Sequence, residues 1–344
     1  MLQHVRLVRR SVRITHAMLN LTVLGMRLFA KKPALVAMDP YTLSETVLVT
    51  DGSTDFVNTA TFSAVDRLRS RYYTLLQPVG MSGIHLGRFA LDPPTMLATL
   101  PLPTTIAFGH CGDDGALYGV DIMNSTGPYF ARIDPDTATV TCQTWIGKNF
   151  TMDVSGVVAM DGVNSRTYAV MSPARGGNAF TLFTFDASCN RIAEQVLWPT
   201  PDLQGPSGLT FYRPRGSPAT DAGTLLAFLP PIGGAWELVA IDPRSGSVTA
   251  TNAARGLPAL HLFDSGAIFL APRPSGNGSV LHVALASEPG LPSRIFGIDV
   301  ACALEPSVGP PPNCTLSNRA WPRPPHRVAP VNLALYSPPT MEKR

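Results

Sequence analysis

One phrase recurs along the chain and constrains its fold more than any other feature. An apolar run, an aspartate that is often followed by proline, a few polar residues and a second apolar run occur six times in 344 residues. The aspartates are Asp39, Asp92, Asp134, Asp186, Asp242 and Asp299, spaced 53, 42, 52, 56 and 57 residues apart. A repeat of this length is one supersecondary unit that buries its apolar surface against neighbouring copies. We therefore expect a single repeat domain, although the length would also allow two domains.

Each copy of the phrase predicts a β-hairpin. The aspartate carboxylate can accept a hydrogen bond from the backbone amide two residues on, and proline fixes φ near the value that a type I turn needs. In the copy at residues 236–250, Asp242 and Pro243 are followed by Gly246, which suits a left-handed position before the chain returns. The flanking strands are apolar at successive positions, which is typical of strands that are covered on both faces.

A second hairpin precedes each later copy of the phrase. These hairpins are expected at residues 62–76, 105–120, 156–171, 208–229 and 259–272. Each unit then has four strands, A to D, joined as A–B and C–D hairpins. The chain begins with a C–D pair at 34–49 and ends near residues 327–337 in what reads as a lone A–B pair. Pairing these two ends would complete one sheet and remove exposed sheet edges.

Two copies of the phrase carry a resemblance to a known superfamily. Residues 130–135 (FARIDP) and 238–243 (LVAIDP) resemble the "LYAIDPxTG" repeats of quinoprotein-like and related bacterial β-propellers. The resemblance implies an all-β fold: a single β-propeller at residues 34–337, closed by its N- and C-terminal strands. About six four-stranded antiparallel blades are expected, with seven as the alternative count. Residues 1–33 would then form an N-terminal basic segment and residues 338–344 a C-terminal tail.

The charge distribution separates the N-terminal segment from the rest of the chain. Residues 1–38 contain seven basic and no acidic residues, and the remainder contains 20 basic and 24 acidic residues. A mildly acidic domain disfavours nucleic acid as a partner. The apolar run at residues 17–25 is too short for a transmembrane segment, and no later stretch is long enough. It suits an ordinary structured N-terminus, a secretory signal or a mitochondrial transit peptide, with secretion favoured over mitochondrial import.

Five cysteines and several glycosylation sequons lean towards a secretory pathway. No CxxC pair is present, so the common zinc spacings are absent. Cys302 and Cys314 flank a proline-rich loop and are either disulfide-bonded or two ordinary thiols, and the odd count leaves at least one cysteine free or paired with another chain. The possible glycosylation sites in the expected propeller are Asn124, Asn149, Asn277 and Asn313. We expect all four in B–C or D–A connections, on one face.

Functional residues are few, because the sequence has no GxSxG, HExxH, P-loop or GxGxxG motif. Ligands of propellers usually bind in the central channel and on the face of the B–C and D–A connections. His261 and His326 are candidates to face that channel, and each can equally be a packed side chain. The rim candidates are Arg175, Trp145 and Trp198, and a tryptophan here can equally cap its own blade.

Two functions from different classes remain open. The favoured one is a non-catalytic binding propeller for a protein or small-molecule ligand, because the superfamily hosts scaffolds and receptors and no catalytic residue set is recognisable. The alternative is a propeller enzyme of the lactonase, esterase or lyase type, with a metal or carboxylate site at the central channel. No cofactor is implied, and Ca²⁺ is expected only under the enzyme alternative.

Overall fold

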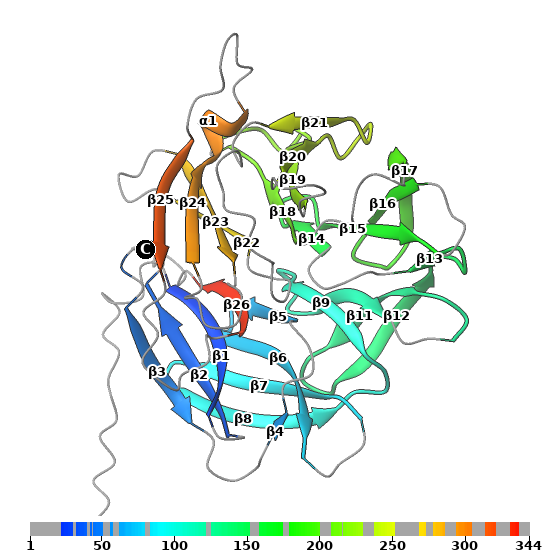
Figure 1. Cartoon of the computed structure of the whole chain (residues 1–344). Helices are drawn as coiled ribbons and strands as arrows, with labels where there is room; N and C mark the ends of the chain where they lie inside the picture. Colours follow the sequence, from blue (N-terminus) through cyan, green and yellow to red (C-terminus); the bar gives the residue numbers. More distant parts are fainter. Residues whose placement is uncertain are drawn as a thin grey trace, which may run out of the picture.

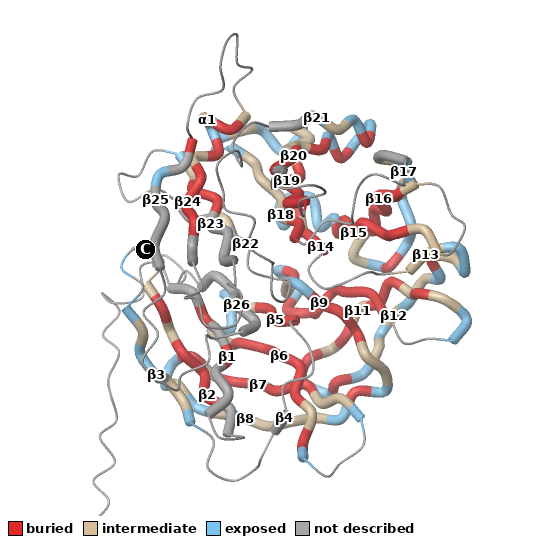
Figure 2. Tube along the Cα trace, in the orientation of Figure 1, coloured by how far each residue is buried: buried red, intermediate tan, exposed pale blue. Residues whose placement is uncertain are grey.

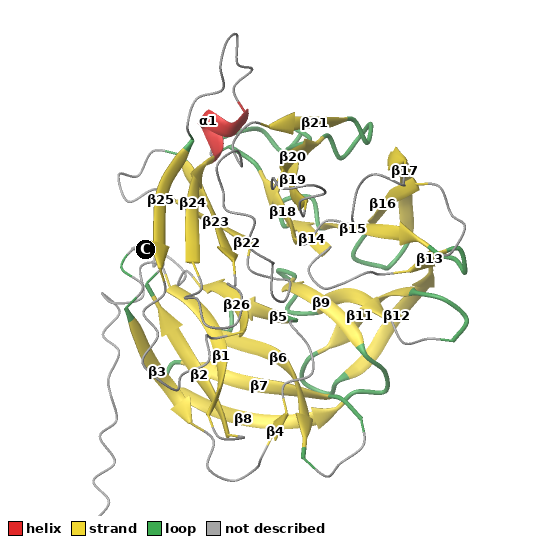
Figure 3. Ribbon diagram, in the orientation of Figure 1, coloured by secondary structure: helices red, strands yellow, loops and turns green. Residues whose placement is uncertain are grey.

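The computed structural model describes the greater part of the chain. The described ranges are residues 22–29, 32–39, 42, 44–50, 56–57, 62–79, 83–121, 125–151, 158–174, 179–199, 208–214, 216–229, 237–251, 268–272, 278–285, 294–304, 314–320 and 331–336. Within these ranges the strands form six antiparallel sheets and are accompanied by one short helix, α1 (Val300–Leu304). Figure 3 shows how strongly strands dominate the described structure. No helix in the described ranges is long and apolar enough to span a membrane.

The sheets are numbered here in chain order. Sheet 1 contains β26 (Val331–Tyr336), β1 (Thr22–Phe29), β2 (Lys32–Met38) and β3 (Glu45–Thr50). Sheet 2 contains β4 (Phe56–Val57), β5 (Ser63–Asp66), β6 (Arg71–Pro78), β7 (His85–Leu91) and β8 (Pro94–Pro101). Sheet 3 contains β9 (Ile106–Cys111), β10 (Leu117–Asp121), β11 (Tyr129–Asp134) and β12 (Thr139–Trp145).

The other three sheets follow the same order. Sheet 4 contains β13 (Phe150–Thr151), β14 (Val158–Asp161), β15 (Arg166–Pro173), β16 (Ala179–Phe185) and β17 (Arg191–Pro199). Sheet 5 contains β18 (Gly208–Tyr212), β19 (Thr224–Leu229), β20 (Glu237–Ile241) and β21 (Val248–Thr251). Sheet 6 contains β22 (Ile268–Pro272), β23 (Ser279–Leu285), β24 (Arg294–Asp299) and β25 (Thr315–Ala320). In sheets 2 and 4 the first strand consists of two short pieces that both pair with the second strand.

The sheets follow one another around a common centre (Figure 1). The first strand of each sheet contacts the first strand of the next one. The contacts run β26–β5, β5–β9, β9–β14, β14–β18, β18–β22 and β22–β26. The C-terminal strand β26 pairs with β1, whose register joins Leu24 to Ala334. The two ends of the described chain therefore share sheet 1.

The apolar core lies between neighbouring sheets. Phe130 of sheet 3 stacks on Phe185 of sheet 4 with ring centroids 4.0 Å apart. Another cluster joins Phe228 of sheet 5 to Phe296 of sheet 6. Figure 2 shows buried residues concentrated in the inner and middle strands, while the outer strands carry most of the exposed positions. Apolar residues at successive strand positions are thus explained, since both faces of a sheet pack against neighbours.

The turns at the repeated aspartates confirm the hairpin prediction. Each of the six aspartates is the last residue of the third strand of its sheet or directly follows that strand. The amide two residues on donates to the carboxylate at Asp134 (2.8 Å), Asp186 (2.9 Å) and Asp242 (2.9 Å). Asp299 accepts the same bond from the Ala301 amide at 3.2 Å, and the chain there enters α1 before it returns as β25.

The ends of the expected propeller differ from the prediction. Residues 22–29, expected within the N-terminal basic segment, form β1 and lie between β2 and β26. The C-terminal region expected to supply an A–B pair contributes one described strand, β26, to sheet 1. Leu24 and Met26 are fully buried in a cluster with Tyr72 and Phe89 of sheet 2. This packing stabilises β1, although Gly25 and Arg27 interrupt its apolar run. The expected tail, 338–344, lies outside the described residues.

The strand order of sheet 6 corrects the expected positions of two sequons. Asn277 and Asn313 lie outside the described residues, but their flanking strands are hairpin partners: β22 with β23, and β24 with β25. They therefore belong to A–B and C–D connections and not to the B–C and D–A connections that we predicted. Asn149, between β12 and β13, keeps its predicted connection, and so does Asn124, which lies outside the described residues between β10 and β11. The four sequons are consequently divided between both kinds of connection.

Candidate functional site

Four turns form a continuous polar surface at one end of sheets 2 to 5. They join the first and second strands of each sheet and are called here the turn belt: residues 66–71, 111–117, 161–166 and 212–224. Arg69 Nη1 of the first turn donates to the carbonyl oxygen of Gly115 in the second, at 3.3 Å. Asn164 Nδ2 of the third turn donates to Ala219 O of the fourth, also at 3.3 Å. The first turn thus contacts the second, and the third contacts the fourth.

Gly115 is required where the first two turns meet. Its φ is +77°, and a Cβ atom at this position would lie 2.2 Å from Arg69 Nη1. A side chain here would therefore be strained in its backbone and would displace the guanidinium that joins the turns.

A buried ion pair joins the third and fourth turns. Arg213 donates to both oxygens of Asp161, with Nη1–Oδ1 at 3.0 Å and Nη2–Oδ2 at 2.9 Å, and the side chains are 9% and 1% exposed. Arg213 Nη2 also donates to the carbonyl oxygen of Asp221 at 2.8 Å. Asp161 additionally accepts from the Val163 amide and from Asn164 Nδ2. Such a bidentate pair fixes the relative position of sheets 4 and 5.

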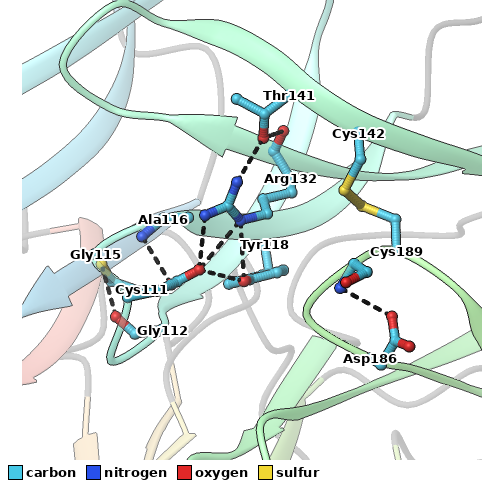
Figure 4. A network of polar contacts seen from close by, with 12 residues as sticks. Cys111, Gly112, Gly115, Ala116, Tyr118, Arg132, Thr141, Cys142, Asp186 and Cys189 are labelled. Atoms are coloured by element: carbon cyan, nitrogen blue, oxygen red, sulfur yellow. Dashed lines mark hydrogen bonds and ion pairs between the residues drawn. A yellow bond between two sulfur atoms is a disulfide. The ribbon is translucent and has the colours of Figure 1, made fainter.

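The second turn of the belt contains the polar network drawn in Figure 4. Asp114 Oδ2 accepts from Tyr118 Oη at 2.7 Å and from Arg132 Nη2 at 2.8 Å, and Asp114 Oδ1 accepts from the Ala116 amide at 3.0 Å. Arg132 Nη1 donates to Thr141 Oγ1 at 3.0 Å. Burial alone would raise the pKa of Asp114, but these hydrogen bonds and the charge of Arg132 hold it below its ordinary value.

His110 and Cys111 of β9 are of residue types that often act in catalysis, but both are poorly suited to react here. The ring of His110 stacks on Tyr118 at 6.0 Å, and burial lowers the pKa of His110 to about 3 despite the nearby Asp114. His110 is therefore neutral at physiological pH. Burial, followed by the charges of Asp66 and Asp114, raises the pKa of the Cys111 thiol. A thiol of this kind remains protonated and is a weak nucleophile.

Further ties join sheets 2, 3 and 4 near the C–D turns. Asp136 of sheet 3 forms ion pairs with two arginines of sheet 2. Its Oδ1 lies 2.6 Å from Arg71 Nη1 and 2.7 Å from Arg88 Nη2. A disulfide joins Cys142 of β12 to Cys189 in the turn between β16 and β17, and Thr144 Oγ1 donates to the carbonyl oxygen of Cys189. The C–D turn of one sheet is thus held against the preceding sheet by charge, by hydrogen bonds or by a covalent bond.

The predicted cysteine pair is present, and a second pair was not foreseen. Cys302 in α1 and Cys314 before β25 form a disulfide, with Cα atoms 5.6 Å apart, and Cys111 is free. The Cys142–Cys189 pair spans 47 residues and two sheets. Its only sequence signal was the common position of the two residues, each near the C–D hairpin of adjacent repeats.

The structure describes two of the five predicted channel and rim residues, Trp145 and Trp198. Trp145 is the last residue of β12 and is 49% exposed, and its Nε1 donates to the carbonyl oxygen of Thr126 in its own sheet. It therefore caps its own sheet. Trp198 lies within β17 and not in a D–A connection. His261, His326 and Arg175 lie outside the described residues. In the described ranges no three His, Cys, Asp or Glu side chains are grouped as metal ligands would be.

Comparisons with known proteins relate the chain to others by fold alone. Neither a protein-family model nor a curated protein sequence matches it. Hydrazine synthase of Kuenenia stuttgartiensis is similar in structure, with a TM-score of 0.50 at 11% identity over 86% of this chain and 85% of that chain. TolB from Acinetobacter baumannii gives a TM-score of 0.47 at 13% identity over 81% of this chain and 60% of that chain.

A third structure extends the range of the comparison. The Pan2 WD40 domain of Neurospora crassa gives a TM-score of 0.42 at 10% identity over 74% of this chain and 70% of that chain. These structures are β-propeller-type proteins, and the likeness to hydrazine synthase shows that this chain has a fold of the β-propeller type. Identities this low specify no function, and propeller-type proteins include both enzymes and binding proteins.

Proposed function

We propose that the chain is a closed six-bladed β-propeller that binds a protein or small-molecule ligand and catalyses no reaction on it. The cyclic contacts between the first strands of the six sheets support this blade count and closure. The pairing of β26 with β1 supports the same arrangement, since it joins the two ends of the described chain in one blade.

One observation carries the functional part of the proposal. Several charged side chains of the turn belt and the adjacent C–D turns tie neighbouring blades together, as in the pairs Asp161–Arg213 and Asp136–Arg88. The Asp114 carboxylate is held by Arg132 and Tyr118. With its pKa lowered by these partners, Asp114 is a weak base at neutral pH. The paired groups act as structural ties. They give instead a rigid frame, which suits recognition by loops on its surface.

We further propose that the protein works in an oxidising compartment. Two disulfides, one between blades and one closing a 12-residue separation, are typical of proteins outside the reducing cytosol. Asn149 is exposed, and its side chain is then available for glycosylation. Peptide mapping of secreted material under non-reducing conditions, with site-resolved mass spectrometry of Asn149, tests both statements.

Turnover assays test the binding function against the enzyme alternative. Purified full-length chain is assayed on a panel of lactone and ester substrates, with added calcium and with a chelator. We expect no saturable turnover and no calcium-dependent shift of the melting temperature. Saturable hydrolysis that the substitution His261→Ala or His326→Ala removes would replace the proposal with the enzyme alternative.

A further inference from the structure

Two turns of the belt are copies of one structure. In the proposed propeller each sheet is one blade and keeps its number. The turn of blade 2 reads Asp-Arg-Leu-Arg-Ser-Arg (66–71), and that of blade 4 reads Asp-Gly-Val-Asn-Ser-Arg (161–166). The first aspartate of each is buried, at 2% and 1% exposure. Ser70 and Ser165 share a φ of 50°, which residues with a side chain seldom adopt. The equal geometry means that equivalent positions of the two turns point out of the fold in the same way.

The first aspartate holds each turn rigidly. Asp66 Oδ1 accepts from the Arg69 amide at 2.9 Å, and Asp161 Oδ1 accepts from the Val163 amide at 3.1 Å and the Asn164 amide at 3.4 Å. A capped turn of this kind loses little conformational entropy when a partner binds to it.

The third position of each turn holds a large aliphatic side chain in solvent. Leu68 is 66% exposed and Val163 is 65% exposed. Among the other exposed large aliphatic side chains of the described ranges, only Val196 is exposed to a similar degree, at 67%. Two such side chains at equivalent turn tips are therefore unusual. Aliphatic side chains held in water on a rigid surface gain free energy when a partner covers them.

The turn of blade 3 lies between these two tips. It contacts the turn of blade 2 through Arg69 and Gly115, and Asp113 Oδ2 would be 3.9 Å from a Cβ atom on Gly162 in the turn of blade 4. Leu68 and Val163 therefore flank a central polar turn on one continuous surface.

The charge of this surface has a small positive excess. The exposed charged residues of the three turns are Arg67, Arg69, Arg166, Asp113 and Asp114. Asp114 is ion-paired with Arg132, and Arg69 is ion-paired with the buried Asp66 at 3.6 Å. Arg67 and Arg166 remain against Asp113, whose charge interacts with Arg67. The remaining positive charge is complementary to a partner with carboxylates.

We propose that Leu68, Val163 and the arginines around them form a docking surface for an acidic segment of a partner protein. The segment carries two aliphatic side chains, which cover Leu68 and Val163, and carboxylates, which pair with Arg67 and Arg166. This proposal rests on the binding function proposed above and names the surface and the chemistry of its ligand.

A random peptide display library, panned against the immobilised full-length chain, tests the proposal. We expect enrichment of peptides with two aliphatic residues and at least one Asp or Glu. The best peptide should bind the double variant L68S/V163S at least about tenfold more weakly, as is usual when anchor residues are removed. The substitution Arg67→Glu should weaken binding further, and added salt should weaken it in the wild type.

A matched control separates this surface from general stickiness. Val196 and Ile192 of the outer strand β17 are 67% and 49% exposed, comparable to the turn residues. The control variant I192S/V196S should bind the same peptide within about twofold of wild type. Because all four residues are exposed, circular dichroism and the melting temperature should show both variants folded, and single variants L68S and V163S repeat the measurement if the double variant is unstable.

Several outcomes would overturn the docking surface while leaving the binding function standing. They are an absence of enriched peptides, enrichment of basic or uncharged peptides, and equal binding to L68S/V163S. Loss of self-association or of binding to anionic vesicles in L68S/V163S would assign the surface to a second copy or to a membrane. Catalytic turnover in the assays above would overturn the binding function itself, which keeps the two failures distinguishable.

Discussion

Replacing Arg213 by methionine should destabilise the fold strongly, because it leaves a buried carboxylate without its countercharge. Asp161 is 1% exposed and would lose two hydrogen bonds, at 3.0 and 2.9 Å. Breaking a buried pair from one side costs about 3–5 kcal/mol. Asp161 keeps the Val163 amide at 3.1 Å and Asn164 Nδ2 at 2.7 Å, which still solvate the charge. We therefore expect the lower end of that range, about 3 kcal/mol of unfolding free energy.

Urea unfolding followed by circular dichroism measures this loss. Adding Asp161→Asn to the Arg213→Met variant should restore part of the stability, since the second change removes the buried charge. The control is Arg191→Met, which breaks a surface pair with Glu194 whose side chains are 42% and 46% exposed. Exposed pairs contribute little, so this change should cost less than about 1 kcal/mol.

The reasoning fails under either of two results. One is a cost below about 1 kcal/mol for Arg213→Met, which would mean that the pair is worth no more than a surface pair. The other is a double variant as unstable as the sum of its single variants, because independent effects add and coupled ones do not.

Four further predictions concern covalent, electrostatic and steric contacts of sheets 3 and 4. The two disulfides close loops of different length, with sequence separations of 47 residues for Cys142–Cys189 and 12 residues for Cys302–Cys314. Urea unfolding should show that C142S/C189S loses about 4 kcal/mol of unfolding free energy and C302S/C314S about 3 kcal/mol, because the longer loop restricts the unfolded chain more. His110 has a folded pKa of about 3, below its unfolded pKa of about 6.5. Its contribution to stability is therefore fully present above pH 6.5 and is lost as the pH falls from there towards 3. Between pH 6.5 and 5 the wild type should lose more unfolding free energy than H110Q, and an equal dependence of unfolding free energy on pH in both proteins would contradict this. Asp114 has a lowered pKa, so its contribution is present above its unfolded pKa of about 3.9 and is lost as the pH falls through the folded value; the difference in melting temperature between wild type and D114N should shrink below pH 4. A Cβ on Gly119 would lie 2.3 Å from the carbonyl oxygen of Ala107, whereas a Cβ on Gly162 would meet only Asp113 Oδ2 at 3.9 Å. In urea unfolding, G119A should therefore lose at least about 2 kcal/mol of unfolding free energy, and G162A should lose little. Similar losses in both variants would show that β9 and β10 can separate to accept the methyl group.

The hairpins could be predicted because the signals for them are local. An aspartate that caps its own turn needs only a few neighbouring residues, and the bonds at Asp134, Asp186 and Asp242 form within the turn itself. The same applies to strands such as β20, whose apolar residues stand directly before Asp242. The repeated local signal therefore placed the third and fourth strands of sheets 1 to 5. In sheet 6 it placed the third strand only, because α1 follows Asp299 and β25 begins at Thr315.

The ends of the fold could not be predicted in this way, because nonlocal pairing decides them. β1 is held by β26, which follows it by some three hundred residues, and by packing of Leu24 and Met26 near Tyr72. No property of residues 22–29 alone distinguishes that strand from the apolar run of a targeting segment. The Cys142–Cys189 bond is equally nonlocal, since its geometry depends on how sheets 3 and 4 pack.

The contacts between blades also explain why the candidate site was hard to recognise from sequence. Aspartates and arginines in turns are residues that often suggest catalysis, and here Asp161, Asp114 and Arg213 serve as ties between or within sheets. Once such residues are assigned to structure, attention shifts to side chains that the fold exposes and does not use. Leu68 and Val163 meet that criterion at equivalent positions of two rigid turns. In a fold whose charges hold neighbouring sheets together, we expect the functional surface among exposed apolar residues, and not among buried polar ones.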